Sequence, residues 1–517
     1  MLRAGARPAS TTRKSVPFSS LALGLAWGLL VYAWVVNAWL GDDAFITFRT
    51  AQNLAEGFGP RWNPGERVQT YTHPLWMLLV SLFFRITGEF YLTVLGLSLA
   101  LTMGAVRLVV RGLDPDRSTL ALCALVVSKA FIDYTSSGLE NPLSYFLLAA
   151  FVVSRGATSR VALAGAIFLT RQDLILLVFP GLVLALWRER PSLRLSRLLV
   201  ALSPVAAWAV FALFYYGFFF PNTAYAKLGT GIPAIELASH GVWYFVNSLK
   251  WDAPTLPLLA AGLIVALRSR APEAVTNTVG VIAYLLYVVW IGGDFMTGRF
   301  FAAPLLFVVA TALRALPQAP KVTVSLAVAF VITIAAPLAP LKTTREYRGH
   351  LLGWDHGVTD ERGLYWRKDT GLIFWGQRGP LPIHPNIDYA RDLKAGGETV
   401  VVEGIIGLLG WAGGRDLTII DPLALGDPLL ARLPIAPGDW WSVGHFPRRL
   451  PPGYEASIRA GHNEIRDPSL RLYYQKLRLI TSGPLFSADR LNTIFQMNIG
   501  RYNGLLRTYV DSLKPGS

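Results

Sequence analysis

Long apolar runs separated by short polar segments recur through the first two-thirds of the chain. A helix needs about 20 apolar residues to cross a bilayer, and several runs reach that length. This pattern is typical of an α-helical polytopic membrane protein. We expect about twelve apolar helices, within residues 20–40, 74–87, 91–110, 118–134, 142–154, 161–172, 174–187, 198–219, 255–267, 276–292, 300–316 and 322–340.

The positions of Lys and Arg orient these helices. A basic segment precedes the run at 20–40, and no small-residue cleavage site follows before Gly41. We therefore interpret this run as a signal anchor with a cytoplasmic N-terminus. A full crossing at 74–87 would put Arg107 and its basic neighbours outside, so we expect a re-entrant or juxtamembrane helix there. The sequence thus predicts about eleven crossings, with a first outer loop at 41–90.

The chain changes character after residue 340. Strong apolar runs end, Gly, Pro and charged residues return, and short β-like runs appear at 399–402 and 417–420. About 170 residues are enough for one compact domain. We expect residues 1–340 to form a transmembrane domain and residues 341–517 to form a C-terminal α/β domain outside the membrane, on the periplasmic side.

Composition narrows the class of protein. Of 517 residues, 53% are hydrophobic and only 16% are charged, against about 25% charged in soluble domains. A soluble enzyme and a disordered chain are therefore excluded. The net charge of +15 is explained by cytoplasmic helix flanks rather than by nucleic acid. The single cysteine, Cys123, lies inside an apolar run and leaves no disulfide framework or thiolate metal site.

The outer loops concentrate the residues that carry chemistry. Asp42 and Asp43 follow the first apolar run directly, where carboxylates are costly to desolvate. Such a pair can act as a general base or bind a divalent cation (Mg²⁺, Mn²⁺ or Ca²⁺). The alternative is that Asp42 caps a helix over 43–56, which explains one carboxylate but not both.

Further candidates lie in the later outer loops. His73 suits hydrogen bonding to a polar substrate, or else it caps the helix at 74–87, whereas Trp62 and Trp76 fit interfacial anchors. Arg171 either pairs with Asp173 or holds an anion, because Arg and Lys can clamp a phosphate and stabilise it as a leaving group. The candidate substrate-binding residues are His73, Glu140, Arg171, Lys227, Asp294 and Arg299.

Other motifs are missing from the sequence. It has no GxxxxGK[ST], no GxGxxG opening a helix, no zinc spacing and no GxSxG elbow. A lipid-linked phosphate donor and a polar acceptor meeting at the outer face of the membrane fit the clusters best.

Several segments resemble one family of enzymes. The chain is similar to C-type (GT-C) membrane glycosyltransferases, in which an acidic residue stands in the first outer loop before juxtamembrane helices. GDDAFITFR, ERVQTYTHPLW, SGLENPL, PNTAYAKL and GGDFMTGRFF resemble the terminal β-(1→2) arabinofuranosyltransferases of actinobacterial cell walls. GIIGLLGWAGG, DPLALGDPLLARLP and GHFPRR continue the likeness, so that it covers roughly residues 30–510.

The resemblance implies a function and partners. It implies transfer of arabinofuranose from a decaprenyl-phosphate donor to the arabinan of arabinogalactan or lipoarabinomannan, by a multi-pass protein of the bacterial plasma membrane. It gives Asp42 and Asp43 the catalytic role and leaves open which of them leads. Inversion by direct displacement and retention through a nucleophile or ion pair both stay open.

Two points remain open alongside this interpretation. A transporter or flippase of a lipid-linked sugar is a rival, although no internal repeat supports it, and a different lipid-phosphosugar is another. Four residues of the outer domain are candidates for binding a polysaccharide or glycolipid acceptor, with core or interfacial packing as the alternative for the tryptophans. They are Trp411, Trp440, Trp441 and His445.

Overall fold

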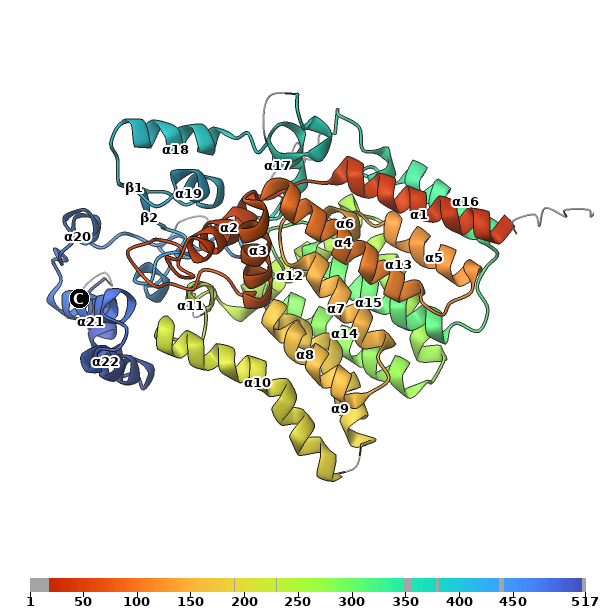
Figure 1. The fold of residues 1–517 in the computed structure, drawn as a ribbon, viewed down its shortest axis with the longest axis horizontal. Helices are drawn as coiled ribbons and strands as arrows, with labels where there is room; N and C mark the ends of the chain where they lie inside the picture. The colour runs from red at the N-terminus through yellow and green to blue at the C-terminus, as the bar shows by residue number, and fades with distance from the viewer. Residues whose placement is uncertain are drawn as a thin grey trace, which may run out of the picture.

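The computed structural model describes residues 18–189, 191–228, 230–347, 355–377, 381–436 and 441–513. This part of the chain is mostly helical. Figure 1 shows a bundle of long helices at one side of the molecule and the C-terminal elements, coloured blue, at the opposite end.

Each predicted apolar run overlaps at least one helix, although the runs at 20–40, 198–219 and 322–340 extend past the helix ends. The run at 118–134 is divided into two helices, because Ser128 caps the second one by accepting a hydrogen bond from the N–H of Phe131. One amphipathic helix, α12, has no counterpart among the predicted runs. The elements up to residue 342 are α1 (Phe18–Asn37), α2 (Asp42–Ala55), α3 (Pro74–Thr87), α4 (Tyr91–Val110), α5 (Pro115–Val126), α6 (Lys129–Asp133), α7 (Asn141–Val153), α8 (Ala157–Thr170), η1 (Gln172–Leu174), α9 (Ile175–Trp187), α10 (Pro191–Tyr215), α11 (Asn222–Lys227), α12 (Ala234–Trp251), α13 (Thr255–Arg268), α14 (Pro272–Trp290), α15 (Arg299–Ala315), α16 (Val322–Ala335) and η2 (Pro340–Lys342).

The bundle contains membrane-spanning candidates of three kinds. Within the described residues, four helices are long and apolar enough to cross a bilayer: α1, α4, α10 from Leu195 onward, and α14. Helices α12 and α13 together make a fifth candidate, broken by a bend of 104°. Shorter apolar helices include α3, α7, α8, α9 and α16. The chain is thus a polytopic helical membrane protein, and the number of about eleven crossings stays a prediction.

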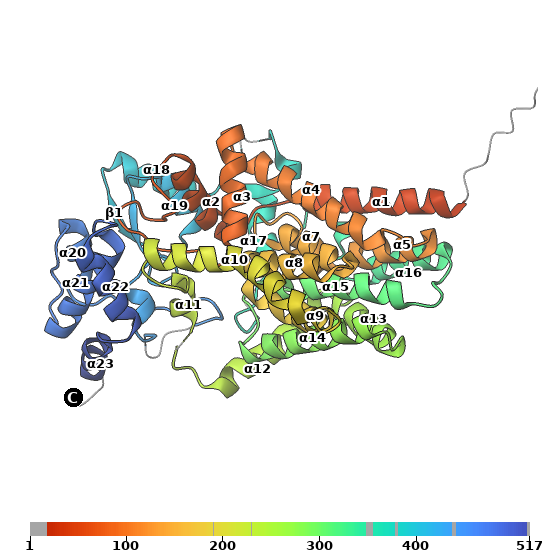
Figure 2. The same cartoon turned by 60° about the horizontal axis from the view of Figure 1, so that its bottom comes forward.

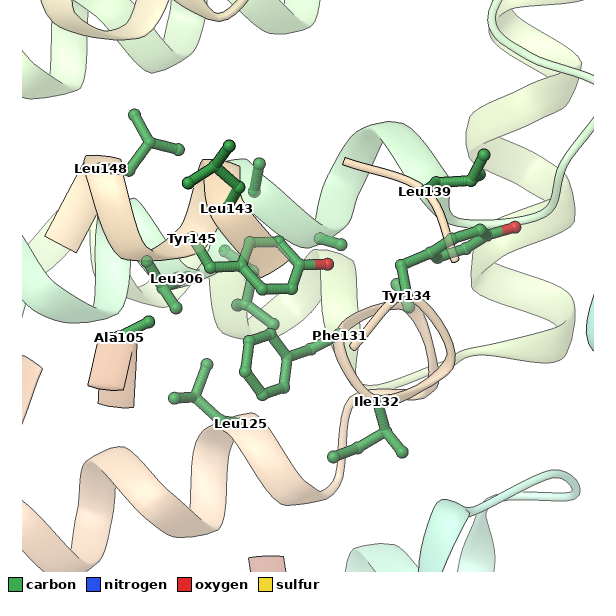
Figure 3. Packing of buried hydrophobic residues seen from close by; sticks show 14 of the residues in the cluster. Ala105, Leu125, Phe131, Ile132, Tyr134, Leu139, Leu143, Tyr145, Leu148 and Leu306 are labelled. Carbon is green, nitrogen blue, oxygen red and sulfur yellow. The ribbon is translucent and has the colours of Figure 1, made fainter. Parts of the chain in front are cut away.

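The core around α6 and α7 is packed with aromatic and aliphatic side chains (Figure 3). Phe131 of α6 and Tyr145 of α7 are fully buried, with ring centroids 5.2 Å apart. Leu306 of α15 and Leu125 of α5 belong to the same buried cluster. This packing fixes both ends of the segment between α6 and α7, which carries Glu140.

The region after residue 342 is mainly helical, with a small parallel sheet. Val400 pairs with Thr418, close to where the sequence predicts strands, and the sheet has two strands among the described residues. The predicted α/β domain and its boundary at residue 340 stay predictions. The elements are α17 (Glu361–Tyr365), η4 (Trp366–Thr370), η5 (Leu372–Phe374), α18 (Pro385–Ala395), β1 (Val400–Val402), α19 (Gly407–Gly413), β2 (Thr418–Ile420), η6 (Leu430–Arg432), α20 (Tyr454–Ala460), α21 (Pro468–Ser482), α22 (Ala488–Asn498) and α23 (Asn503–Ser512).

The C-terminal region is attached to the bundle near the end of α1. The N–H of Leu372 donates to the carbonyl of Ala38 at 2.9 Å. Val358, Trp366 and Leu408 belong to the same hydrophobic cluster as the bundle helices. Figure 2 shows α19 beside α2, at the end of the bundle that faces the C-terminal elements. Side chains from both parts of the chain therefore meet around the start of α2.

Candidate active site

The two adjacent carboxylates have different surroundings. Asp42 is buried, and its Oδ2 and Oδ1 accept hydrogen bonds from the N–H groups of Gly407 and Leu408 at 2.9 and 2.8 Å. These N–H groups belong to the first turn of α19, where a carboxylate is favourable. A Cβ at Gly407 would lie 1.9 Å from the carbonyl oxygen of Asp42, so only glycine permits this approach.

The alternative in which Asp42 caps the helix that follows it in sequence is therefore wrong. The N-cap of α2 is Gly41, with no side-chain cap, and Asp42 caps α19 instead. Burial raises the pKa of Asp42 to about 6, although the backbone bond from Leu408 opposes the shift.

Asp43 is the available member of the pair. It is partly exposed and, within the part of the chain that the structure describes, forms no direct hydrogen bond or ion pair. Burial raises its pKa, while the positive charges of Arg299 and Lys227 act in the opposite direction. Asp43 thus presents a carboxylate that faces cations without being fixed to one.

Glu140 is the centre of a buried charge cluster. Its Oε1 lies 3.2 Å from Nη2 of Arg299 and 3.9 Å from Nη1 of Arg171, and its Oε2 lies 3.5 Å from Nδ1 of His73. Burial opposes ionisation, but Arg299, His73 and Arg171 outweigh it and lower the pKa of Glu140 to about 2. Glu140 is therefore a fixed anion that holds two arginines and His73 in place.

His73 connects this cluster to α2. Its Nε2 lies 2.8 Å from Oγ1 of Thr47, and burial lowers its pKa. His73 stands at the N-cap position of α3 but makes no side-chain cap bond, so the alternative in which its ring caps the helix is wrong. Trp62 and Trp76 are fully buried, and the interpretation as interfacial anchors is wrong for both.

The two arginines of the cluster are held by further contacts. Nε of Arg171 donates to Oδ1 of Asp173 at 3.0 Å, and its guanidinium lies 4.5 Å from the ring centroid of Phe300. The predicted pair with Asp173 is thus present, and Arg171 also faces Glu140. Arg299 begins α15, and its Nη1 lies 3.6 Å from Oδ2 of Asp294. Burial raises the pKa of Asp294, and Arg299 opposes that shift.

Lys227 differs from these arginines. It ends α11, its side chain is exposed, and it has no hydrogen bond or ion pair with any residue that the structure describes. Its Nζ lies 3.5 Å from the position that a Cβ on Gly444 would occupy. Because Lys227 also acts electrostatically on Asp43 and Asp294, it is a free cation at this site.

The candidate acceptor-binding residues do not form one group. The ring of His445 packs edge-on against Phe295, with centroids 4.3 Å apart, and burial together with the charge of Lys227 lowers its pKa to about 4. Trp441 packs against Phe446 instead, and Trp411 packs against the large hydrophobic cluster. Trp440 lies outside the described residues. His445 is thus beside the charged site, and the acceptor-binding role of these residues stays a prediction.

Glu361 is a further acidic group that sequence reasoning missed. It begins α17 and is buried, and its burial together with the charges of Asp43, Asp42 and Asp294 raises its pKa well above the ordinary value. The next residue, Arg362, pairs through Nε with Oδ1 of Asp133 at 2.7 Å and so anchors the segment. No local motif marks Glu361, because only tertiary packing brings it near residues more than 300 positions away.

A divalent cation in a protein is held by several ligands that converge on one point. Within the described ranges, no three His, Cys, Asp or Glu side chains converge as a metal site requires. The divalent cation suggested for the acidic loop stays a prediction.

The sequence is similar to those of two known enzymes. The chain is 30% identical over 320 residues to a terminal β-(1→2)-arabinofuranosyltransferase of Corynebacterium glutamicum, covering 52% of this chain and 46% of that one. It is 29% identical over 346 residues to the enzyme of the same name from Mycobacterium tuberculosis, covering 56% and 53%. The resemblance to this family is confirmed. The chain spans about half the length of these relatives. No protein-family model and no solved structure matches it.

Proposed function

We propose that this protein is a membrane glycosyltransferase that moves arabinofuranose from a polyprenyl-phosphate donor to an arabinan acceptor. The observation that carries the proposal is the unpaired carboxylate of Asp43 in the field of Arg299 and Lys227. Similarity to two arabinofuranosyltransferases supplies the sugar. The site would face the outer side of the bacterial plasma membrane, with the N-terminus in the cytoplasm.

Lys227 and Arg299 are proposed to bind the donor phosphate. A phosphate that leaves with the polyprenol gains negative charge in the transition state, and fixed cations stabilise that charge. Lys227 needs no rearrangement to do so, because it has no ion pair with any described residue. Arg299 reaches the same space from α15 while Glu140 keeps its guanidinium in position.

Asp43 is proposed as the reacting carboxylate. In direct displacement it takes the proton of the acceptor hydroxyl while that oxygen bonds to the anomeric carbon and the bond to the phosphate oxygen breaks. In a two-step reaction its oxygen bonds to the anomeric carbon as the bond to the phosphate oxygen breaks. The acceptor oxygen then displaces the carboxylate from that carbon, and its proton passes to the released phosphate. The anomeric configuration of the product distinguishes the two routes. Asp42 supports either route by fixing α19 against α2.

The decisive experiment uses purified full-length protein. It is incubated with radiolabelled polyprenyl-phospho-arabinofuranose and an arabinan oligosaccharide, with the Asp43→Asn variant as the matched control. The proposal expects labelled oligosaccharide and free polyprenyl phosphate from the natural chain only. The same protein is also reconstituted in lipid vesicles. Labelled donor that crosses the vesicle membrane without transfer to the acceptor would indicate a flippase and contradict the proposal.

A further inference from the structure

Two C-terminal helices, α21 and α22, contact the end of α10, a candidate membrane-spanning helix. Nη2 of Arg490 on α22 donates to the carbonyl of Tyr215, the last residue of α10, at 2.8 Å. Nδ2 of Asn498, also on α22, donates to the carbonyl of Gly217 at 2.8 Å. A Cβ at Gly217 would lie 2.2 Å from Cγ2 of Ile480 on α21, so the two helices are in close contact with this end of α10.

One face of α22 is apolar and open. Ile494 and Met497 point into a buried cluster, whereas Leu491, Phe495 and Ile499 follow one another at four-residue spacing on the exposed side. Phe495 and Ile499 are each 60% exposed. The helix thus has apolar residues on its exposed side as well as on its buried side, and an exposed apolar patch of this kind marks a surface that binds a membrane or another protein.

This open face continues into the exposed apolar surface of α10. Phe486, just before α22, is 82% exposed, and its ring centroid lies 5.5 Å from that of Phe214 on α10. Phe219 and Phe220, just after α10, are also exposed. Exposed Phe side chains are typical of the apolar face of segments that lie in a membrane interface. Figures 1 and 2 both show α22 beside the end of α10.

We propose that α22 is an interfacial helix whose Phe486–Leu491–Phe495–Ile499 face inserts into the outer leaflet of the bilayer beside α10. Lipid is the occupant that fits, because the patch is continuous with the exposed apolar surface of α10, a helix long and apolar enough to cross a bilayer. The hydrogen bonds from Arg490 and Asn498 hold the patch at the depth where that helix ends. The C-terminal region is then held at the membrane at two places, by α19 on α2 and by α22 in lipid. The inference depends on α10 spanning the membrane and not on the proposed activity.

The test places a fluorophore on this face. The natural chain has one cysteine, Cys123, which is buried and so reports background labelling. Phe495→Cys is labelled with an environment-sensitive nitrobenzoxadiazole dye, and Ala456→Cys on the exposed side of α20 is the matched control. Ile499→Cys, on the same face as Phe495, serves if the first variant does not fold. Each protein is reconstituted in nanodiscs with or without phosphatidylcholine carrying a nitroxide high on the acyl chain.

The proposal expects blue-shifted emission from the Phe495→Cys label and loss of most of that emission with nitroxide lipid. The Ala456→Cys label should emit as in water and keep its intensity. Water-like emission from both labels would overturn the proposal. Blue-shifted emission that nitroxide lipid leaves unchanged would also overturn it, because protein, such as a second copy of the chain, would then cover the face.

Discussion

Replacing Glu140 with glutamine tests whether the charge cluster is the structural centre of the site. The pKa of Glu140 falls from 4.5 to about 2 in the folded chain, because the cations around it outweigh the effect of burial. At 1.36 kcal/mol per pKa unit, the ionised form stabilises the fold by about 3 kcal/mol. That agrees with the cost of about 3–5 kcal/mol for removing one partner of a buried ion pair.

The sign of this effect is fixed by the direction of the shift. A lowered folded-state pKa gives stability that is present above pH 4.5 and is lost as the pH falls toward about 2. The Glu140→Gln variant should therefore unfold at a lower temperature than the natural chain at neutral pH. The difference should narrow in acid, where the natural chain also loses the charge.

The matched control is Glu361→Gln. The pKa of Glu361 lies well above its ordinary value, because burial and the nearby carboxylates disfavour its charge, so this charge does not stabilise the fold as that of Glu140 does. Glutamine should then change the free energy of unfolding by less than about 1 kcal/mol. Thermal unfolding of both variants in the same detergent gives the comparison. Equal stability of Glu140→Gln and the natural chain, or greater damage from Glu361→Gln, would refute this reasoning.

Three further predictions concern the acidic pair and the free lysine. Asp43→Asn should lower the rate of transfer by about 10²–10⁴-fold, as expected for loss of a general base, without lowering the melting temperature. Lys227→Met should raise the KM for the lipid donor by about 10–100-fold through loss of a charge-assisted contact, and its melting temperature should stay unchanged because Lys227 is exposed. Burial raises the pKa of Asp42 from 3.8 to about 6, so the stability that it contributes is present below pH 3.8 and lost as the pH rises through about 6. The natural chain should therefore lose about 3 kcal/mol relative to Asp42→Asn over that range, and a constant difference in melting temperature would contradict this.

Helix positions were predictable because apolar runs report them directly. The bounds of α3 and α4 coincide with the runs at 74–87 and 91–110. The amphipathic α12 was missed because its apolar residues are interrupted by polar ones, so that no continuous run marks it. The number of crossings could not be fixed in the same way, since several apolar helices are shorter than a bilayer requires.

The candidate site was predictable as a list of residues but not as an arrangement. The sequence predicts the outer loops at one end of the helical bundle, and Glu140, Arg171 and Arg299 do meet there. The difference between Asp42 and Asp43 depends on α19, a helix more than 350 residues further along the chain. Glu361 likewise reaches the site through α17. Local patterns carry no information about such distant partners.

The balance of charge at the site explains how it could receive an anionic donor. Glu140 is held by Arg299, Arg171 and His73 and stays ionised, so it contributes a constant negative charge. Asp43 and Asp294 have raised pKa values because burial disfavours their ionised forms, and the charge of Lys227 opposes both shifts. A phosphate that binds Lys227 would cancel this opposing charge and raise both pKa values further. Donor binding should therefore make the Asp43 carboxylate a stronger base for the proton of the acceptor hydroxyl, and departure of the phosphate should favour release of that proton.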